Sequence, residues 1–199
     1  MSTQQALLVP PTQSAANGFR DSAFVKNKEL PVHRWVPWIA GFSAQFVDDC
    51  LSNYLPHNGK GDYCVLDPFA GVGTTLVQAY MKGFNVVGFE INPYAALASK
   101  VKLEAAGINS RTLRAQIAGF EKFMRQRCGS NNGHPSSEPP TGFSGRTELF
   151  SPAVERKVLF ALDYIKGISR PEVRDLFRLA LGSVMVSFSK YPYALTASN

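Results

Sequence analysis

The residues best suited to chemistry lie in one stretch of the chain, residues 63–92. Gly71 and Gly73 stand in a short turn after one apolar run, and Glu90 ends a second apolar run. Glycines remove side chains where a backbone turns sharply or where a ligand comes close. A carboxylate at the tip of the second run can accept two hydrogen bonds from ribose hydroxyls. This pattern favours the binding of a nucleoside through its sugar.

Two strands and one helix must position these residues. Residues 63–66 have the length and apolar character of a buried parallel strand, and residues 84–89 form a second such run. Between them, residues 76–82 are predicted to form a helix that Gly83 ends. The N-terminus of that helix offers free N–H groups and a positive dipole end beside the glycine turn. The order is that of the first half of a nucleotide-binding α/β unit.

The glycine pattern also limits the ligand. A dinucleotide fingerprint would place a third glycine at position 76, where this chain has Leu76. A pyrophosphate is therefore less favoured than a nucleoside without phosphates. The alternative is an ordinary α/β turn whose glycines serve only steric needs, but that alternative does not require an acid at the tip of the second strand.

The stretch resembles S-adenosylmethionine-dependent methyltransferases, and among them the DNA enzymes that modify an exocyclic amine, adenine N6 or cytosine N4. Their first motif has the form DPFxGxGTT, and here it comprises Asp67, Pro68, Phe69, Ala70, Gly71, Val72, Gly73, Thr74 and Thr75. Their second motif is matched by Gly88, Phe89, Glu90, Ile91, Asn92 and Pro93, with Ala95, Ala96 and Lys100 following. Both motifs lie on the expected elements at the expected separation.

The resemblance implies S-adenosylmethionine as cofactor and assigns roles to these positions. Asp67 and the turn at residues 71–75 would contact the methionine end, and Glu90 would bind the ribose hydroxyls. Ile91 would pack on the adenine, beside Asn92. The aromatic segment at residues 33–38, HRWVPW, resembles the family's motif X, which lines the methionine end.

Trp35 and Pro37 are the candidate cofactor contacts of that aromatic segment. The alternative is that the segment is an aromatic N-terminal staple of a core helix, because apolar residues continue at helical spacing up to Tyr54.

The motif with which this family binds the methyl acceptor is missing from this sequence. Such enzymes carry the tetrapeptide [DNS]PP[YFW], whose side chain and carbonyl accept hydrogen bonds from the exocyclic amine of an extruded base. Pro139 and Pro140 lie between Glu138 and Thr141, so they match neither in type nor in place. The catalytic residues therefore stay unassigned.

The expected fold is α/β and Rossmann-like, as in methyltransferases, but incomplete, with few parallel strands and a helix-rich C-terminal part. We expect a disordered or loosely packed leader at 1–32 and a cofactor-binding half at 33–127. A linker or long loop at 128–147 and a helical segment at 148–199 follow. On this hypothesis the chain is the N-terminal half of a methyltransferase, either truncated or completed by a second polypeptide.

Charge and cysteine content agree with this class without specifying it. The formal net charge is +6, and seven basic residues, Lys102 among them, lie between positions 100 and 127. A helical face that carries these basic residues can approach DNA phosphates, although a face exposed to solvent is the commoner explanation. Three unpatterned cysteines favour reduced thiols in the cytoplasm over disulfides or a metal site, and no apolar run is long enough for a membrane span.

Three functional hypotheses remain. The first is the cofactor half of a DNA amino-methyltransferase, of the kind found in restriction-modification systems. The second is a non-catalytic S-adenosylmethionine-binding subunit or an inactive remnant that lacks the acceptor motif. The third is an RNA methyltransferase, since related forms of the first motif occur there.

Overall fold

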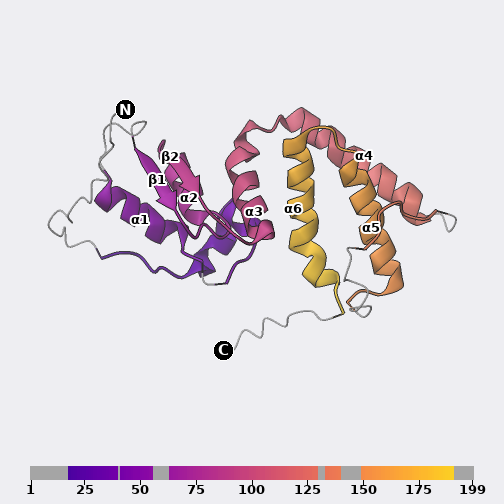
Figure 1. Ribbon diagram of the computed structural model, residues 1–199, viewed down its shortest axis with the longest axis horizontal. Helices are drawn as coiled ribbons and strands as arrows, with labels where there is room; N and C mark the ends of the chain where they lie inside the picture. Colours follow the sequence, from indigo (N-terminus) through magenta and orange to yellow (C-terminus); the bar gives the residue numbers. More distant parts are fainter. Residues whose placement is uncertain (1–17, 40, 56–62, 130–132, 140–148, 191–199) are drawn as a thin grey trace. The chain divides into compact units, whose positions relative to one another are not determined.

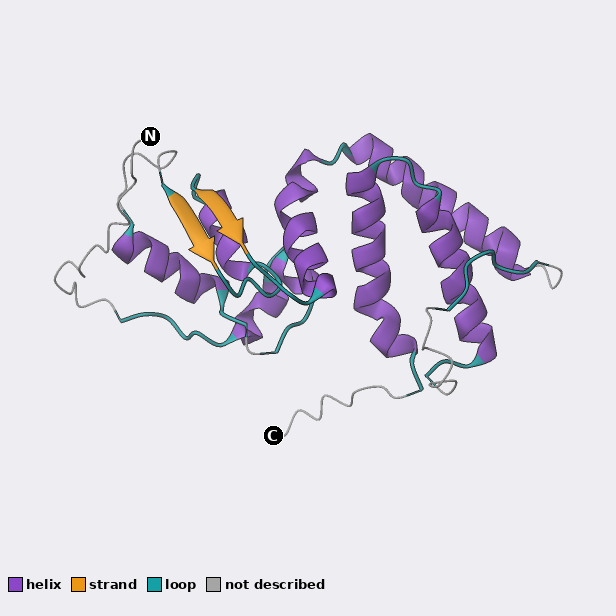
Figure 2. Ribbon diagram, in the orientation of Figure 1, coloured by secondary structure: helices purple, strands orange, loops and turns teal. Residues whose placement is uncertain are grey.

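The computed structural model describes residues 18–39, 41–55, 63–129, 133–139 and 149–190 (Figure 1). Internal contacts divide the chain into two compact units, Met1–Leu103 and Glu104–Asn199. The described residues form six α-helices and one two-stranded parallel sheet (Figure 2). The chain is therefore a mixed α/β protein, as the sequence predicted.

The parallel sheet lies in the first unit. β1 (Cys64–Asp67) pairs with β2 (Asn85–Gly88), and α2 (Thr74–Met81) connects them. These boundaries agree with the predicted strand, helix and strand to within two residues. The register sets Asp67 opposite Gly88, so the carboxyl ends of both strands meet at one edge of the sheet. Gly83 follows α2 with a φ of +87°, the left-handed conformation that ends helices.

One face of the sheet is covered by helices. α1 (Ala44–Tyr54) begins at Ser43, whose hydroxyl accepts the N–H of Phe46 at 3.1 Å. A hydrophobic cluster joins α1 and α2 to the two strands and to residues that flank these elements. Its members are Val47, Leu51, Leu55, Val65, Ala79, Phe84 and Val86.

The other face of the sheet is uncovered among the described residues, which corrects the expectation of buried strands. Cys64 and Val87 are exposed, and the side chain of Leu66 is 58% exposed. Parallel sheets ordinarily bury both faces. The strand residues are apolar on both faces of the sheet, whereas the helices that pack on this sheet cover only one face.

The segment before α1 packs against the start of that helix. Residues 18–32 are described and include the 3₁₀ helix η1 (Phe24–Glu29), while residues 1–17 lie outside the described part. The Asn27 amide is buried, donates to the carbonyl of Phe42 at 2.9 Å and accepts the N–H of Ala44 at 2.8 Å. This amide fixes the entry into α1.

The second unit is helical in its described residues. It contains η4 (Ala105–Gly107), α4 (Ser110–Gly129), α5 (Pro152–Lys166) and α6 (Pro171–Phe188). α5 packs on both α4 and α6. This packing explains why α4 groups with the second unit, whereas the sequence placed it with the cofactor-binding half at 33–127.

The three helices of the second unit begin in different ways. At α5 the side chain of Ser151 accepts the N–H of Val154. α4 is capped by Asn109, whose side-chain oxygen Oδ1 accepts the N–H groups of residues 111 and 112. α6 starts after Arg170 without a side-chain cap.

Part of the predicted linker is packed on α5. The N–H groups of Ser136 and Ser137 donate to the carboxylate of Asp163, each at 2.7 Å. These bonds lower the pKa of the Asp163 carboxyl against the opposing effect of its burial. Residues 133–139 therefore lie on one face of α5, while the rest of the range 130–148 falls outside the described residues.

Candidate functional site

The glycine turn lies across the tips of β1 and β2. The N–H of Phe89 donates to the carbonyl of Asp67 at 3.0 Å, and the N–H of Ala70 donates to the carbonyl of Phe89 at 2.9 Å. The Asp67 carboxylate accepts the N–H of Phe69 at 3.0 Å, so it closes its own turn, to which Pro68 also belongs. The two strand tips and the turn thus form one continuous structure.

Glycine is required at two positions of the turn. Gly71 and Gly73 have φ values of +52° and +82°, which side-chain-bearing residues rarely adopt. A Cβ on Gly73 would lie 3.0 Å from the Cα of Ser99, so the backbone of α3 (Pro93–Glu104) occupies that space. Thr74 and Thr75 follow at the start of α2, and Thr74 is buried.

Glu90 joins the second strand tip to the glycine turn. Its Oε2 accepts the N–H of Gly71 at 2.8 Å, and its Oε1 accepts the N–H of Asn92 at 2.8 Å. Asn92 in turn caps α3, because its side-chain oxygen accepts the N–H of Tyr94 at 2.9 Å. A carboxylate has about four acceptor positions, so Glu90 keeps capacity for two further donors such as sugar hydroxyls.

α3 holds the turn from its other side. The hydroxyl of Ser99 donates to the carbonyl of Gly71 at 3.0 Å, and the ammonium of Lys102 donates to the carbonyl of Val72 at 2.9 Å. The turn is therefore fixed at both its N–H and its carbonyl groups.

Lys102 is one of the residues that the sequence grouped with an exposed basic face, and that grouping is wrong for it. The residue is only 4% exposed, and burial lowers the pKa of its ammonium to about 8.

A buried histidine shares this environment. His33, in η2 (His33–Trp35), is buried, and its Nε2 lies 3.5 Å from the side-chain nitrogen of Gln78 on α2. Its Nδ1 has no hydrogen-bond partner among the described residues. Burial, reinforced by the positive charge of Lys102, lowers the pKa of the His33 imidazole to about 4. The imidazole is therefore neutral at pH 7.

The aromatic segment reaches the turn through Trp38. The three atoms nearest to the place of a Cβ on Gly71 all belong to the Trp38 indole, with Nε1 at 3.3 Å. Trp35 is partly buried and Pro37 is exposed. The segment thus lies beside the turn, but the residue in contact is a different tryptophan from the candidate.

A cavity of about 410 Å³ opens beside Glu90. That volume is within the usual range for small-molecule sites. Its lining comes from the turn, α2, β2 and α3: Ala70, Leu76, Val86, Gly88, Phe89, Glu90, Ala96, Ser99, Lys100 and Leu103. Of the predicted site residues, Ala70 and Glu90 line this cavity. Ile91 does not line it and is 100% exposed, with Phe69 also exposed.

Sequence reasoning assigned no individual role to the residues that support the turn from behind. Ser99, Lys102, His33 and Trp38 act through packing between segments distant in the chain. His33 and Trp38 belong to the aromatic segment 33–38 that the sequence singled out. For Ser99 and Lys102 the only sequence signal was position, because they are three residues apart and so share one face of α3.

Part of the chain is similar to curated type II DNA methyltransferases, as the motifs predicted. It is 35% identical over 80 residues to M.BsoBI of Geobacillus stearothermophilus, and 38% identical over 79 residues to M.MjaII of Methanocaldococcus jannaschii. It is also 34% identical over 71 residues to M.AvaI of Nostoc. The resemblance to DNA methyltransferases is thereby confirmed over about 40% of the chain.

The match covers only a small part of each relative. The aligned stretch spans 15% of M.BsoBI and 14% of both M.MjaII and M.AvaI. No family model matches the chain, and no solved structure matches it.

Among the described residues, no helix is both long and apolar enough to cross a bilayer. These residues also contain no group of three or more His, Cys, Asp or Glu side chains placed to hold a metal ion.

Proposed function

We propose that this chain is the S-adenosylmethionine-binding part of a DNA methyltransferase that acts on an exocyclic amine of adenine or cytosine. The observation that carries the proposal is the hydrogen bond from the Gly71 N–H to Glu90. It brings the acid of the second motif and the glycine turn of the first to one edge of the sheet, beside a cavity of suitable size. The relationship to type II DNA methyltransferases supports the same function.

The residues present fit the cofactor. Glu90 retains acceptor positions for the two ribose hydroxyls, and the glycine turn presents a backbone without side chains toward the methionine end. Asp67 and Thr75 border that turn, and the exposed side chain of Ile91 is available to cover the adenine. When bound, S-adenosylmethionine would supply an electrophilic methyl group on a sulfonium.

The residues of this chain would orient and hold the donor. No tetrapeptide of the form [DNS]PP[YFW] occurs in the sequence, so the acceptor amine would be handled by residues outside these 199. Those residues would belong either to the same polypeptide or to a second one. DNA would be the partner of the complete enzyme.

Isothermal titration calorimetry of the unmutated chain with S-adenosylmethionine tests the donor site directly. We expect saturable binding with one site per chain, and weaker binding of S-adenosylmethionine after Glu90 is replaced. Folded protein that binds no S-adenosylmethionine contradicts the proposal.

A non-catalytic subunit or an inactive remnant is the second candidate, and the missing acceptor motif favours it for the isolated chain. Incubation with tritiated S-adenosylmethionine and unmethylated DNA separates the two, with unmethylated RNA as a parallel substrate. We expect cofactor binding without transfer by the chain alone. Methyl transfer to DNA by the isolated chain contradicts the remnant hypothesis, and transfer to RNA alone favours an RNA methyltransferase.

A further inference from the structure

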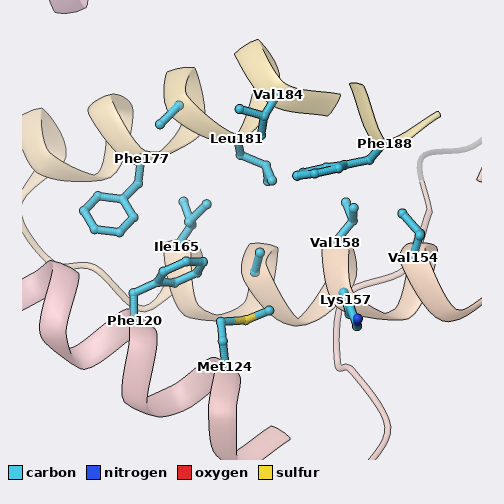
Figure 3. A pocket seen from close by; sticks show the side chains of 12 residues that line it. Phe120, Met124, Val154, Lys157, Val158, Ile165, Phe177, Leu181, Val184 and Phe188 are labelled. Atoms are coloured by element: carbon cyan, nitrogen blue, oxygen red, sulfur yellow. The ribbon is translucent and has the colours of Figure 1, made fainter. Parts of the chain in front are cut away.

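The second unit contains an apolar groove that the proposed cofactor site does not use. The groove has a volume of about 570 Å³ and lies between α5 and α6, with α4 contributing two side chains (Figure 3). Eleven of its twelve lining residues are apolar, and Lys157 is the one charged member. The lining consists of Phe120, Met124, Val154, Lys157, Val158, Ala161, Ile165, Phe177, Ala180, Leu181, Val184 and Phe188.

The lining positions repeat identically on the two long helices. On α5 they begin at Val154 and on α6 at Phe177, and in both helices the following members lie 3, 4, 7 and 11 residues later. This spacing places each set on one helix face. Each stripe extends over about 16 Å of helix axis, because the rise is about 1.5 Å per residue. Two such stripes facing one groove match a third helix of about three turns.

The described residues cover the opposite face of α5 but leave the groove open. Phe160 on that opposite face is buried, Arg156 lies over its ring, and Gly133 of the segment 133–139 lies near it. Along the groove, by contrast, the side chain of Phe188 is 51% exposed and Val184 is also exposed. A small-molecule pocket encloses most of its ligand, whereas a shallow apolar groove with exposed walls suits the apolar face of a helix.

Charge indicates which side chains a bound helix would carry beside its apolar face. Lys157 is exposed in the groove lining and has no ion-pair partner within the described ranges. The sequence of residues 104–199 holds thirteen Lys and Arg against eight Asp and Glu, so this unit carries most of the chain's positive charge. An acidic helix would associate faster and in a preferred orientation on such a surface.

We propose that this groove binds an amphipathic, acidic helix of about three turns from a protein partner. Its leucine-like side chains would occupy the space between the stripes of α5 and α6, and one of its carboxylates would pair with Lys157. The proposal does not depend on the cofactor site, which belongs to the other unit.

A designed peptide tests the proposal with the full chain. The probe is a fluorescein-labelled 18-residue peptide with leucines at spacings 0, 3, 4, 7 and 11 and glutamates on its flanks. A lactam bridge on the outer face keeps it helical, because helices of this length are marginal in water. The control peptide has the same composition with the leucines moved off the stripe. We expect fluorescence anisotropy to show saturable binding of the probe below about 100 µM and none of the control.

Two matched variants locate the binding site. Phe188 and Val186 are both 51% exposed on α6, but only Phe188 lines the groove. Phe188→Asp is expected to weaken binding by at least about tenfold, because it places a charge on the apolar wall of the groove, and Val186→Asp by less than about twofold. Lys157→Glu is expected to weaken binding of the acidic probe and to restore binding of a probe whose glutamates are replaced by lysines.

Three outcomes would overturn the proposal. The first is no binding of the acidic probe by folded protein, checked by circular dichroism. The second is equal weakening by Phe188→Asp and Val186→Asp. The third is a concentration-dependent dimer in analytical ultracentrifugation that Phe188→Asp dissociates, because the occupant would then be a second copy of this chain.

Discussion

The carboxylate of Glu90 accepts the backbone N–H of Gly71 at 2.8 Å, across 19 positions of sequence. The same carboxylate accepts the N–H of Asn92, which caps α3. Glu90 therefore has a structural task before any ligand arrives. A cofactor that uses its remaining acceptor positions would add to this arrangement without requiring the residue to move.

Replacing Glu90 separates its structural task from its proposed ligand contact. Glu90→Gln keeps one acceptor oxygen but loses the charge and half of the acceptor capacity, and Glu90→Ala loses both oxygens. We expect S-adenosylmethionine affinity, measured by calorimetry, to fall by at least about tenfold for Glu90→Ala and by less for Glu90→Gln. Glu29→Ala, at an exposed acid of η1, is the control and should leave affinity unchanged. Equal affinity of all three variants would contradict the proposed ribose contact.

The glycine turn gives a prediction of stability. Gly73→Ala places a Cβ where φ is +82° and the Cα of Ser99 is 3.0 Å away, so the turn or α3 must shift. We expect a loss of about 2 kcal/mol or more in the free energy of unfolding of the first unit. Both tryptophans lie in this unit, so intrinsic fluorescence during urea unfolding reports on it alone.

The matched control for that variant is Gly18→Ala. No heavy atom lies within 4 Å of a Cβ on Gly18, and its φ is not in the left-handed region. Its free energy of unfolding should stay within about 0.5 kcal/mol of the parent. A Gly73→Ala variant as stable as Gly18→Ala would mean that the turn is not held against α3 as described.

The local elements of the site were predictable from sequence because their signals are local. An apolar run, two glycines, a helix of two turns and a second apolar run define β1, α2 and β2 without knowledge of the rest of the chain. The capping of α5 by Ser151 was predictable for the same reason. Gly83 likewise ends α2 with a positive φ.

The supporting residues were not predictable because they depend on packing between distant segments. Lys102 belongs to a run of basic residues that resembles a solvated face, yet its place on α3 directs its ammonium to the carbonyl of Val72. The exposure of Leu66 likewise depends on which layers cover the sheet, and the apolar pattern of β1 carries no information on that point. Trp38 likewise contacts Gly71 from a segment far from it in the sequence.

Removing the buried ammonium of Lys102 should stabilise the first unit at neutral pH. Burial lowers its pKa from 10.5 to about 8, so the charged form is disfavoured in the folded state. We expect Lys102→Met to raise the free energy of unfolding by about 1–3 kcal/mol at pH 7, although the Val72 carbonyl loses its donor. Loss of stability in this variant would show that the hydrogen bond outweighs the burial of the charge.

The pH dependence provides a second check on Lys102. Between pH 8 and 10.5 the unfolded state binds more protons than the folded state, so the parent protein should gain stability as pH rises through that window. The advantage of Lys102→Met should therefore shrink over the same window. Urea unfolding followed by tryptophan fluorescence at several pH values measures both effects.

The lowered pKa of His33 predicts a loss of stability at acidic pH. Burial and the charge of Lys102 lower its pKa from 6.5 to about 4, so between these values the unfolded state binds the additional proton. Stability contributed by the neutral imidazole is complete above pH 6.5 and is lost as pH falls toward 4, by an amount of about 3 kcal/mol in total. His33→Gln should remove this part of the acid dependence, and the difference between the two proteins isolates it from the titration of carboxylates.

Lys102→Met should remove the coulombic contribution to the lowered pKa of His33 and leave that of burial. This variant should therefore lose less stability than the parent as pH falls from 6.5 to 4. Parallel profiles for the parent and His33→Gln between pH 6.5 and 4 would show that the imidazole is accessible to protons in the folded state, and the buried position of His33 against α2 would then be wrong.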